Sequence, residues 1–197
     1  TPITSATING EWATVATRWA NHYRAISRAN TIIKNLESKE IPITDAAKQK
    51  YLAEARFVRA YQYARLIDYF GDVVYYTDVI PLEEAYKTTR TRKEDVLKAV
   101  YEDFDYAIEH LPVSYPAADP ARATRGAAMA FKCRTALYNG DWALARDAAK
   151  MCMELGVYKL YPDFGELFLS KTGKVDEIIY SVPRSVALGV STNIRAY

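Results

Sequence analysis

Aromatic and amide side chains near the start of the chain are the residues best suited to recognise a ligand. Trp12 lies close to Asn9, and Trp19, seven residues further on, lies close to Asn21. An indole face packs against the C–H bonds on one face of a sugar ring, while nearby amides hydrogen-bond the hydroxyl groups. These four residues are candidate ligand contacts, although the same helical spacing also allows the two indoles to pack in a hydrophobic core.

Tyr75 and Tyr76 form a second candidate pair, in a segment rich in β-branched and aromatic residues. The chain contains 16 Tyr but only 6 Phe, and Tyr combines an apolar ring with a polar tip. Arg56 and Arg59 are three residues apart in a stretch rich in Ala and Tyr. They could contact a ligand, but a buried network of ion pairs and hydrogen bonds between helices is the favoured interpretation.

Catalytic and metal-binding patterns are absent from the sequence. It contains no HExxH, GxSxG, P-loop, CxxC or GxGxxG motif, and its two histidines, His22 and His110, are far apart. The two cysteines, Cys133 and Cys152, cannot form a disulfide framework. The sequence therefore predicts a protein that is not an enzyme and has no cofactor or metal ion, and it leaves open whether the two cysteines pair.

The composition is that of a folded domain. Half of the 197 residues are hydrophobic, a quarter are charged, and the net charge is +2. Without a block of Lys and Arg, this balance argues against nucleic-acid binding. The longest apolar run, Ala127–Phe131, is far shorter than the roughly 20 residues that cross a membrane. No signal peptide is visible, and the first residue is Thr1, so we expect a processed or truncated chain.

Hydrophobic periodicity predicts about five main helices, over residues 11–36, 45–70, 91–111, 124–138 and 141–155. On the second helix, the predicted buried side includes Tyr51, Ala55, Val58, Leu66 and Ile67. Residues 73–89 are expected to be extended or looped, 112–120 to form a loop, and 177–182 to form a short strand. The fold class is therefore all-α, and we expect a single domain over residues 1–197.

The last two helices show the spacing of a tetratricopeptide (TPR) repeat, which is a helix–turn–helix unit with small residues at its packed positions. With Gly140 at the turn, Cys133, Ala145 and Cys152 fall at those positions. Trp142 is then predicted to close the hairpin. The pattern indicates a TPR-like array of helical hairpins with irregular loops.

Three segments of the sequence carry specific patterns. The first runs from Trp19 to Asn30 and includes Tyr23, Ile26 and Ala29. The second has the sequence EARFVRAY at residues 54–61, which is the most specific element, and continues to residue 72. The third covers residues 127–138, Gly140-Asp-Trp142, Gly156-x-Tyr158-x-Leu160, Phe164, Leu167-Phe168 and Glu177-Ile-Ile. In their order and spacing, these segments together resemble the SusD/RagB family of nutrient-binding outer-membrane lipoproteins.

The resemblance implies a TPR-like scaffold that carries an irregular ligand-binding half. It also implies a non-enzymatic protein at the extracellular face of the outer membrane, held by a lipid anchor that this chain does not contain. Such proteins bind oligosaccharides and deliver them to a TonB-dependent, SusC-like transporter. Family members are roughly two and a half times as long, so we expect this chain to be a fragment. Peptide cargo, or a TPR-like module that binds only proteins, are the alternatives.

Overall fold

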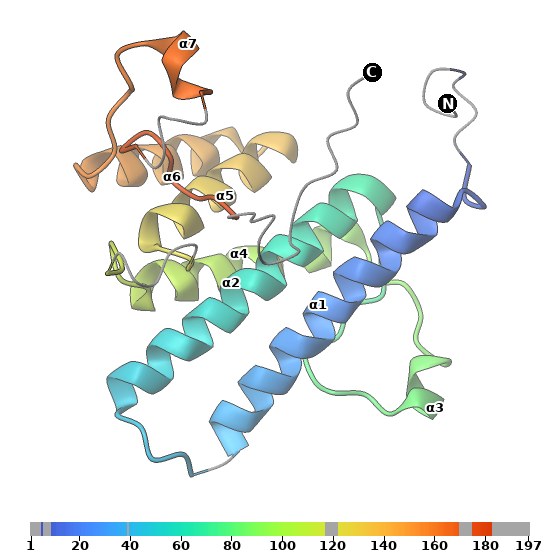
Figure 1. Ribbon diagram of the computed structural model, residues 1–197. Coiled ribbons are helices and arrows are strands. Elements are labelled where there is room, and N and C mark those ends of the chain that lie inside the picture. The colour runs from blue at the N-terminus through green and yellow to red at the C-terminus, as the bar shows by residue number, and fades with distance from the viewer. Residues whose placement is uncertain (1–4, 6–8, 39, 117–121, 170–174, 183–197) are drawn as a thin grey trace.

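The computed structural model describes residues 5, 9–38, 40–116, 122–169 and 175–182 (Figure 1). In these residues the fold is all-α, as predicted. Its helices are α1 (Ala13–Ser38), α2 (Asp45–Phe70), α3 (Leu82–Ala85), α4 (Lys93–His110), α5 (Arg125–Tyr138), α6 (Trp142–Glu154) and α7 (Phe164–Leu167). The five long helices are the predicted ones, and each ends within about two residues of its predicted bounds.

The ends of these helices follow from local hydrogen bonding. At the start of α2, the Ala47 N–H donates to Thr44 Oγ1 over 3.2 Å, and the helix stops at Gly71, whose φ of 68° favours glycine. Thr124 caps α5 in the same way, accepting from the Ala127 N–H at 3.2 Å. Gly140, with φ of 81°, makes the predicted turn between α5 and α6.

The helices pack as a series of neighbours, which confirms the expected array of helical hairpins. α1 packs against α2, α2 against α4, α4 against α5, and α5 against α6. Figure 1 shows α1 and α2 side by side, with the connection that carries α3 on the far side of α1 from α2. The main core lies where α1, α2 and α4 meet and includes Ile26, Phe57, Tyr63, Leu66 and Phe104.

Two local predictions are wrong. Residues 177–182 do not form a strand; Ile179 and Tyr180 instead pack against the core. In the described residues, β pairing is limited to one isolated bridge between Val73 and Thr91. The four-residue helices α3 and α7 were missed, because one turn is too short to show a helical period.

The α5–α6 hairpin confirms the small-residue packing but not the role of Trp142. Ala145 and Cys152 are buried, as predicted, and both cysteines are free thiols. Trp142 is 67% exposed. It precedes Ala145 by three residues and Cys152 by ten, and is therefore turned by about 60° and about 80° around the helix from them. Small side chains make the hairpin contact, so no closing ring is needed.

Candidate ligand-binding site

The six predicted ligand contacts lie on or beside α1, but the structure distributes them. Three grooves run along this helix. Asn9 and Trp12 line the first, Trp19 and Tyr76 line the second, Asn21 lines the third, and Tyr75 lines none of them.

The first groove, which we call the Trp12 groove, has a volume of about 610 Å³ and lies at the N-terminal end of α1. It is lined by Asn9, Gly10, Trp12, Thr14, Val15, Arg18, Tyr69 and Phe70. Asn9 shapes its start, because its Oδ1 accepts from the Glu11 N–H at 3.0 Å and its carbonyl accepts from the Trp12 N–H at 3.2 Å. The indole is half-buried, so one part of it is anchored while another part faces the groove.

Two residues of the Trp12 groove were missed by the sequence analysis. Tyr69 is 47% exposed, and the guanidinium of Arg65 lies 4.7 Å from the centre of its ring and donates to its hydroxyl. Arg18 is exposed at the rim. The signal for Tyr69 was available: two antiparallel helices joined by a short connection bring the end of the second beside the start of the first.

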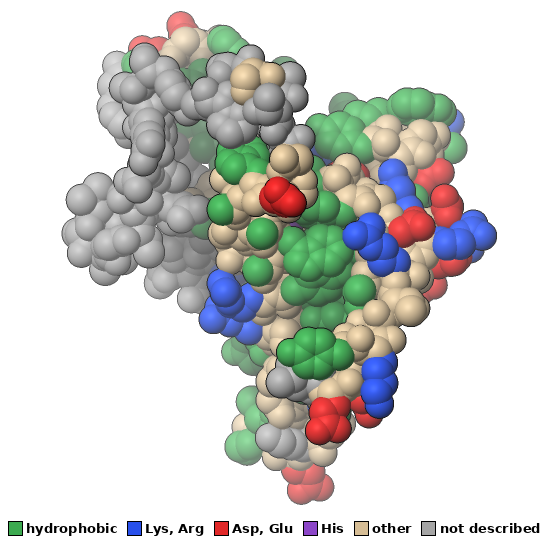
Figure 2. All heavy atoms as spheres, turned by 90° about the vertical axis from the view of Figure 1, so that its right-hand side faces the viewer, with side chains coloured by type: hydrophobic (Ala, Val, Ile, Leu, Met, Phe, Trp, Pro, Cys, Tyr) green, Lys and Arg blue, Asp and Glu red, His purple; other side chains and the backbone are tan. Residues whose placement is uncertain are grey.

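The second groove, the Trp19 groove, has a volume of about 440 Å³ and lies between α1 and the connection that carries α3. It is lined by Trp19, Tyr23, Ser27, Val74, Tyr76, Val79, Ile80, Ala85 and Thr88. Figure 2 looks onto this side of the molecule and shows hydrophobic side chains gathered between charged borders. The rings of Tyr23 and Tyr76 stack with centroids 6.0 Å apart, and Trp19 contacts Tyr23 at 4.9 Å and Phe70 at 5.0 Å.

Trp19 has the core position that the sequence allowed, and its role as a ligand contact stays a prediction. It packs against the main core and also forms part of a groove wall. The guanidinium of Arg90 lies 5.8 Å from its ring, within the range of a cation–π contact. Burial raises the pKa of Tyr23 well above its usual range, and its neutral hydroxyl donates to the Val74 carbonyl at 2.8 Å. This wall is a fixed aromatic surface rather than a titrating one.

Buried polar side chains attach the connection after α2 to the helices. Arg59 forms a two-pronged ion pair with Asp103, at 2.7 and 2.8 Å, and donates to Asn30 Oδ1 at 3.1 Å. The amide nitrogen of Asn30 donates to the Tyr76 carbonyl at 3.2 Å, and the Tyr63 hydroxyl bonds the same carbonyl at 2.8 Å. These bonds confirm the network interpretation of Arg59. They also hold Tyr76 in the Trp19 groove.

The neighbours of this network have supporting roles. Tyr75 packs its ring against Tyr63 at 4.9 Å, and burial raises its pKa. The guanidinium of Arg56 stacks 4.1 Å from the centre of the Tyr106 ring and approaches Asp103 at 4.0 Å. Arg56 thus joins two helices, as the network interpretation predicted.

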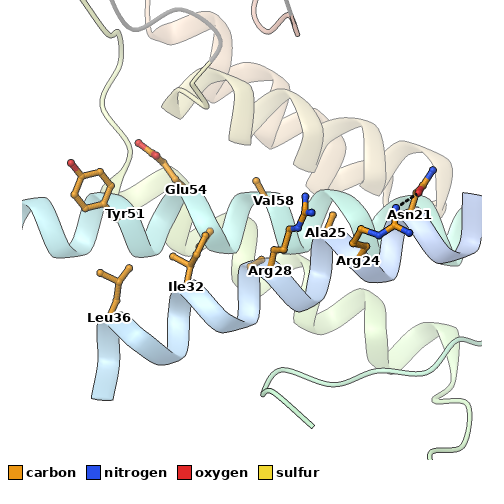
Figure 3. A pocket seen from close by; sticks show the side chains of 11 residues that line it. Asn21, Arg24, Ala25, Arg28, Ile32, Leu36, Tyr51, Glu54 and Val58 are labelled. Carbon is orange, nitrogen blue, oxygen red and sulfur yellow. Dashed lines mark hydrogen bonds between the residues drawn. The ribbon is translucent and has the colours of Figure 1, made fainter. Parts of the chain in front are cut away.

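The third groove, the α1–α2 groove, has a volume of about 650 Å³ and is shown in Figure 3. Its lining residues are Asn21, Arg24, Ala25, Arg28, Ala29, Ile32, Leu36, Tyr51, Glu54, Ala55 and Val58. Asn21 accepts a hydrogen bond from Arg24 at 2.8 Å. Its lining contains a single aromatic ring, that of Tyr51, whereas several rings line each of the other two grooves.

Comparison with known proteins identifies the family. The family model described as starch-binding and associating with the outer membrane matches residues 3–137. This chain belongs to the SusD-like family. The resemblance inferred from the three sequence segments is thereby confirmed.

Individual SusD-like proteins match most of the chain. SusD-like protein P25 of Formosa agariphila is 27% identical over 177 residues, which cover 90% of this chain and 33% of that protein. A SusD-like carbohydrate-binding protein from Bacteroides fragilis is 32% identical with a TM-score of 0.79, covering 84% of this chain and 32% of that one. A structure containing xylogluco-oligosaccharide is 26% identical with a TM-score of 0.69, covering 84% and 34%. The chain spans about a third of the length of the curated relatives it matches.

SusD-like proteins are binding proteins rather than enzymes, and the family associates with the outer membrane. In the part of this chain that the structure describes, no three His, Cys, Asp or Glu side chains are grouped to hold a metal ion. Among the same residues, no helix is both long and apolar enough to span a bilayer.

Proposed function

We propose that this SusD-like protein captures an oligosaccharide at the extracellular face of the outer membrane and delivers it to a SusC-like, TonB-dependent transporter. The observation that carries the proposal is the family match over residues 3–137, with its description of starch binding and outer-membrane association. The carbohydrate-binding relative from Bacteroides fragilis and the relative solved with xylogluco-oligosaccharide support a glycan as cargo. In this proposal a lipid anchor holds the full-length protein at the membrane.

Within this chain, the Trp12 groove is our proposed contribution to the sugar site. Trp12 and Tyr69 offer two aromatic faces, while Asn9 and Arg18 offer hydrogen-bonding groups at the rim. A sugar ring needs this combination, because its faces are apolar and its edge carries hydroxyl groups. The Trp19 groove, with Tyr76 and Tyr23, would extend the aromatic surface along the same helix.

Binding measurements on the full-length protein test this proposal. We expect calorimetry or affinity gels across plant, host and microbial glycans to find a ligand. Trp12→Ala should then weaken binding about tenfold, which corresponds to about 1.4 kcal/mol of lost stacking. Trp142→Ala is the matched control, because that indole is 67% exposed on α6 and lines none of the three grooves.

The outcomes separate the parts of the proposal. If no glycan on a broad panel binds, the glycan hypothesis is wrong, and a peptide that co-purifies with the protein would support peptide cargo. If a glycan binds and Trp12→Ala leaves its affinity unchanged, the site lies elsewhere. Co-isolation of a TonB-dependent barrel with the protein from outer membranes tests the transporter partnership independently.

A further inference from the structure

The connection between α2 and α4 relies on side chains to bond its backbone. Among the described residues, its β pairing is limited to the bridge between Val73 and Thr91. A backbone N–H or C=O that is shielded from water must find another partner, because leaving it unpaired is costly. At Tyr76 one side-chain oxygen serves both groups: the hydroxyl of Tyr63 on α2.

The Tyr63 hydroxyl takes the place of a strand partner. It donates to the Tyr76 carbonyl at 2.8 Å and accepts from the Tyr76 N–H at 3.0 Å. Asn30 adds a second donor to the same carbonyl at 3.2 Å. Tyr63 is buried, and burial raises its pKa well above its usual range. Its hydroxyl therefore stays neutral and can donate and accept at once, which a phenolate cannot do.

These bonds also determine where the ring of Tyr76 lies. The ring of the preceding residue, Tyr75, packs against the Tyr63 ring at 4.9 Å and lines none of the three grooves. The Tyr76 ring lines the Trp19 groove and stacks on Tyr23, with an angle of 15° between the two ring planes. Holding the backbone of Tyr76 therefore holds one aromatic wall of the Trp19 groove.

In the proposed function the Trp19 groove extends the sugar-binding surface, and on that basis we propose that Tyr63 is a positioning residue for oligosaccharide binding. Its hydroxyl sets the Tyr76 ring against Tyr23 before the sugar arrives. Tyr63 lines none of the three grooves, so it acts on the sugar only through Tyr76. A wall that is fixed in advance strengthens binding, because no side chain has to be ordered when the sugar binds.

Tyr63→Phe tests this role in the full-length protein, because it removes the hydroxyl and keeps the ring. We expect the Tyr76 amide to exchange its hydrogen faster in this variant. The sugar probe is xylogluco-oligosaccharide, which a related structure contains, or the panel glycan that the wild type binds most tightly. Calorimetry should show about fivefold weaker binding for Tyr63→Phe and for Tyr76→Ala. Tyr101→Phe, which removes a hydroxyl that bonds Asp141, is the matched control and should change neither measurement.

The double variant Tyr63→Phe/Tyr76→Ala separates positioning from a general loss of stability. If Tyr63 acts through Tyr76, the double variant binds the sugar as weakly as Tyr76→Ala alone. Losses that add, or wild-type affinity in Tyr63→Phe, would overturn the proposal. Asn30→Asp is a second test in case Tyr63→Phe does not fold. It keeps an acceptor for Arg59 and removes the amide donor to the Tyr76 carbonyl, so it should weaken binding in the same non-additive way.

The variants also distinguish this role of Tyr63 from the proposed function as a whole. If Trp12→Ala weakens sugar binding while Tyr63→Phe and Tyr76→Ala do not, the protein binds glycans but Tyr63 does not position a contact. If no glycan on the panel binds the wild-type protein, the proposed function is wrong, and the positioning role is wrong with it.

Discussion

At the α1–α2–α4 end of the molecule, buried polar side chains fasten a long connecting segment, whereas at the α5–α6 end small side chains let two helices approach closely. In the first region Arg59, Asp103 and Asn30 are all less than a tenth exposed and bond one another. In the second, the polar link between the helices is a weak bond from Cys152 Sγ to the Gly126 carbonyl at 3.7 Å. Directional bonds fix where an irregular segment lies; small residues fix only how near two helices come.

The two regions also differ in how strongly their large apolar side chains are exposed. Large apolar side chains at the α6–α7 end are strongly exposed: Trp142 at 67%, Met153 at 79%, Leu160 at 88%, Phe164 at 78% and Phe168 at 71%. In the connection between α2 and α4, Tyr75 and Tyr76 instead pack against the main core, although Tyr86 is 82% exposed. Exposed apolar groups of this kind mark surfaces that suit further packing.

The largest expected effect is at the buried ion pair. Asp103→Ala leaves the Arg59 guanidinium buried without a carboxylate, so we expect the free energy of unfolding to fall by about 3–5 kcal/mol. Asp147→Ala, which removes an exposed partner of Arg146 on α6, should leave the free energy of unfolding nearly unchanged. Urea unfolding of the two variants measures both values.

The double variant Arg59→Met/Asp103→Leu sharpens this test. It replaces both charges with apolar side chains of similar volume, so it should be much less destabilised than Asp103→Ala. The double variant would nevertheless remove the hydrogen bond that Arg59 donates to the Thr77 carbonyl, next to Tyr76. Equal losses for Asp103→Ala and Asp147→Ala would contradict the view that this region depends on polar attachment.

A smaller effect is expected from steric crowding in the second region. A Cβ at Gly126 would meet the hydroxyl and ring edge of Tyr158, so Gly126→Ala should cost about 1–3 kcal/mol of stability. Tyr158→Phe removes the nearest atom, and the double variant should therefore recover part of the loss. Thermal unfolding measures this, with Gly10→Ala as the control, because nothing lies within 4 Å of a Cβ there. If Gly126→Ala unfolds at the same temperature as the wild type, the Tyr158 side chain can move aside and the contact is not tight.

The sequence was informative wherever a feature repeats along one helix. The long helices and the buried small residues such as Ala145 follow from the spacing of residues along the chain. The sequence could not predict which groove each aromatic residue lines, because the spacing of aromatic residues along α1 does not reveal which segment packs against each of them. Val58 shows the limit clearly: its spacing is that of a core residue, and only the absence of a third helix over it in the described chain leaves it exposed.

Asp68 lies where the two regions meet and gives the smallest predicted effect. It is half-buried on α2, and burial raises its pKa, although Arg65 on α2, Lys93 on α4 and Arg134 on α5 oppose the rise. Between the ordinary aspartate pKa and the raised one, the folded state therefore keeps a proton that the unfolded state has lost. The free energy of unfolding consequently falls as the pH rises through this range. Asp68→Asn removes this penalty.

At neutral pH we expect Asp68→Asn to stabilise the protein by about 0.5 kcal/mol or less, because solvent screens a half-exposed group. The gain should disappear at pH values below the ordinary aspartate pKa, where the wild-type carboxyl is protonated in both states. Urea unfolding across this pH range measures the difference, with Asp176→Asn as an exposed control. A loss of stability at neutral pH would mean instead that attraction to the three cations outweighs burial, and that charge pairing extends from the first region to α5.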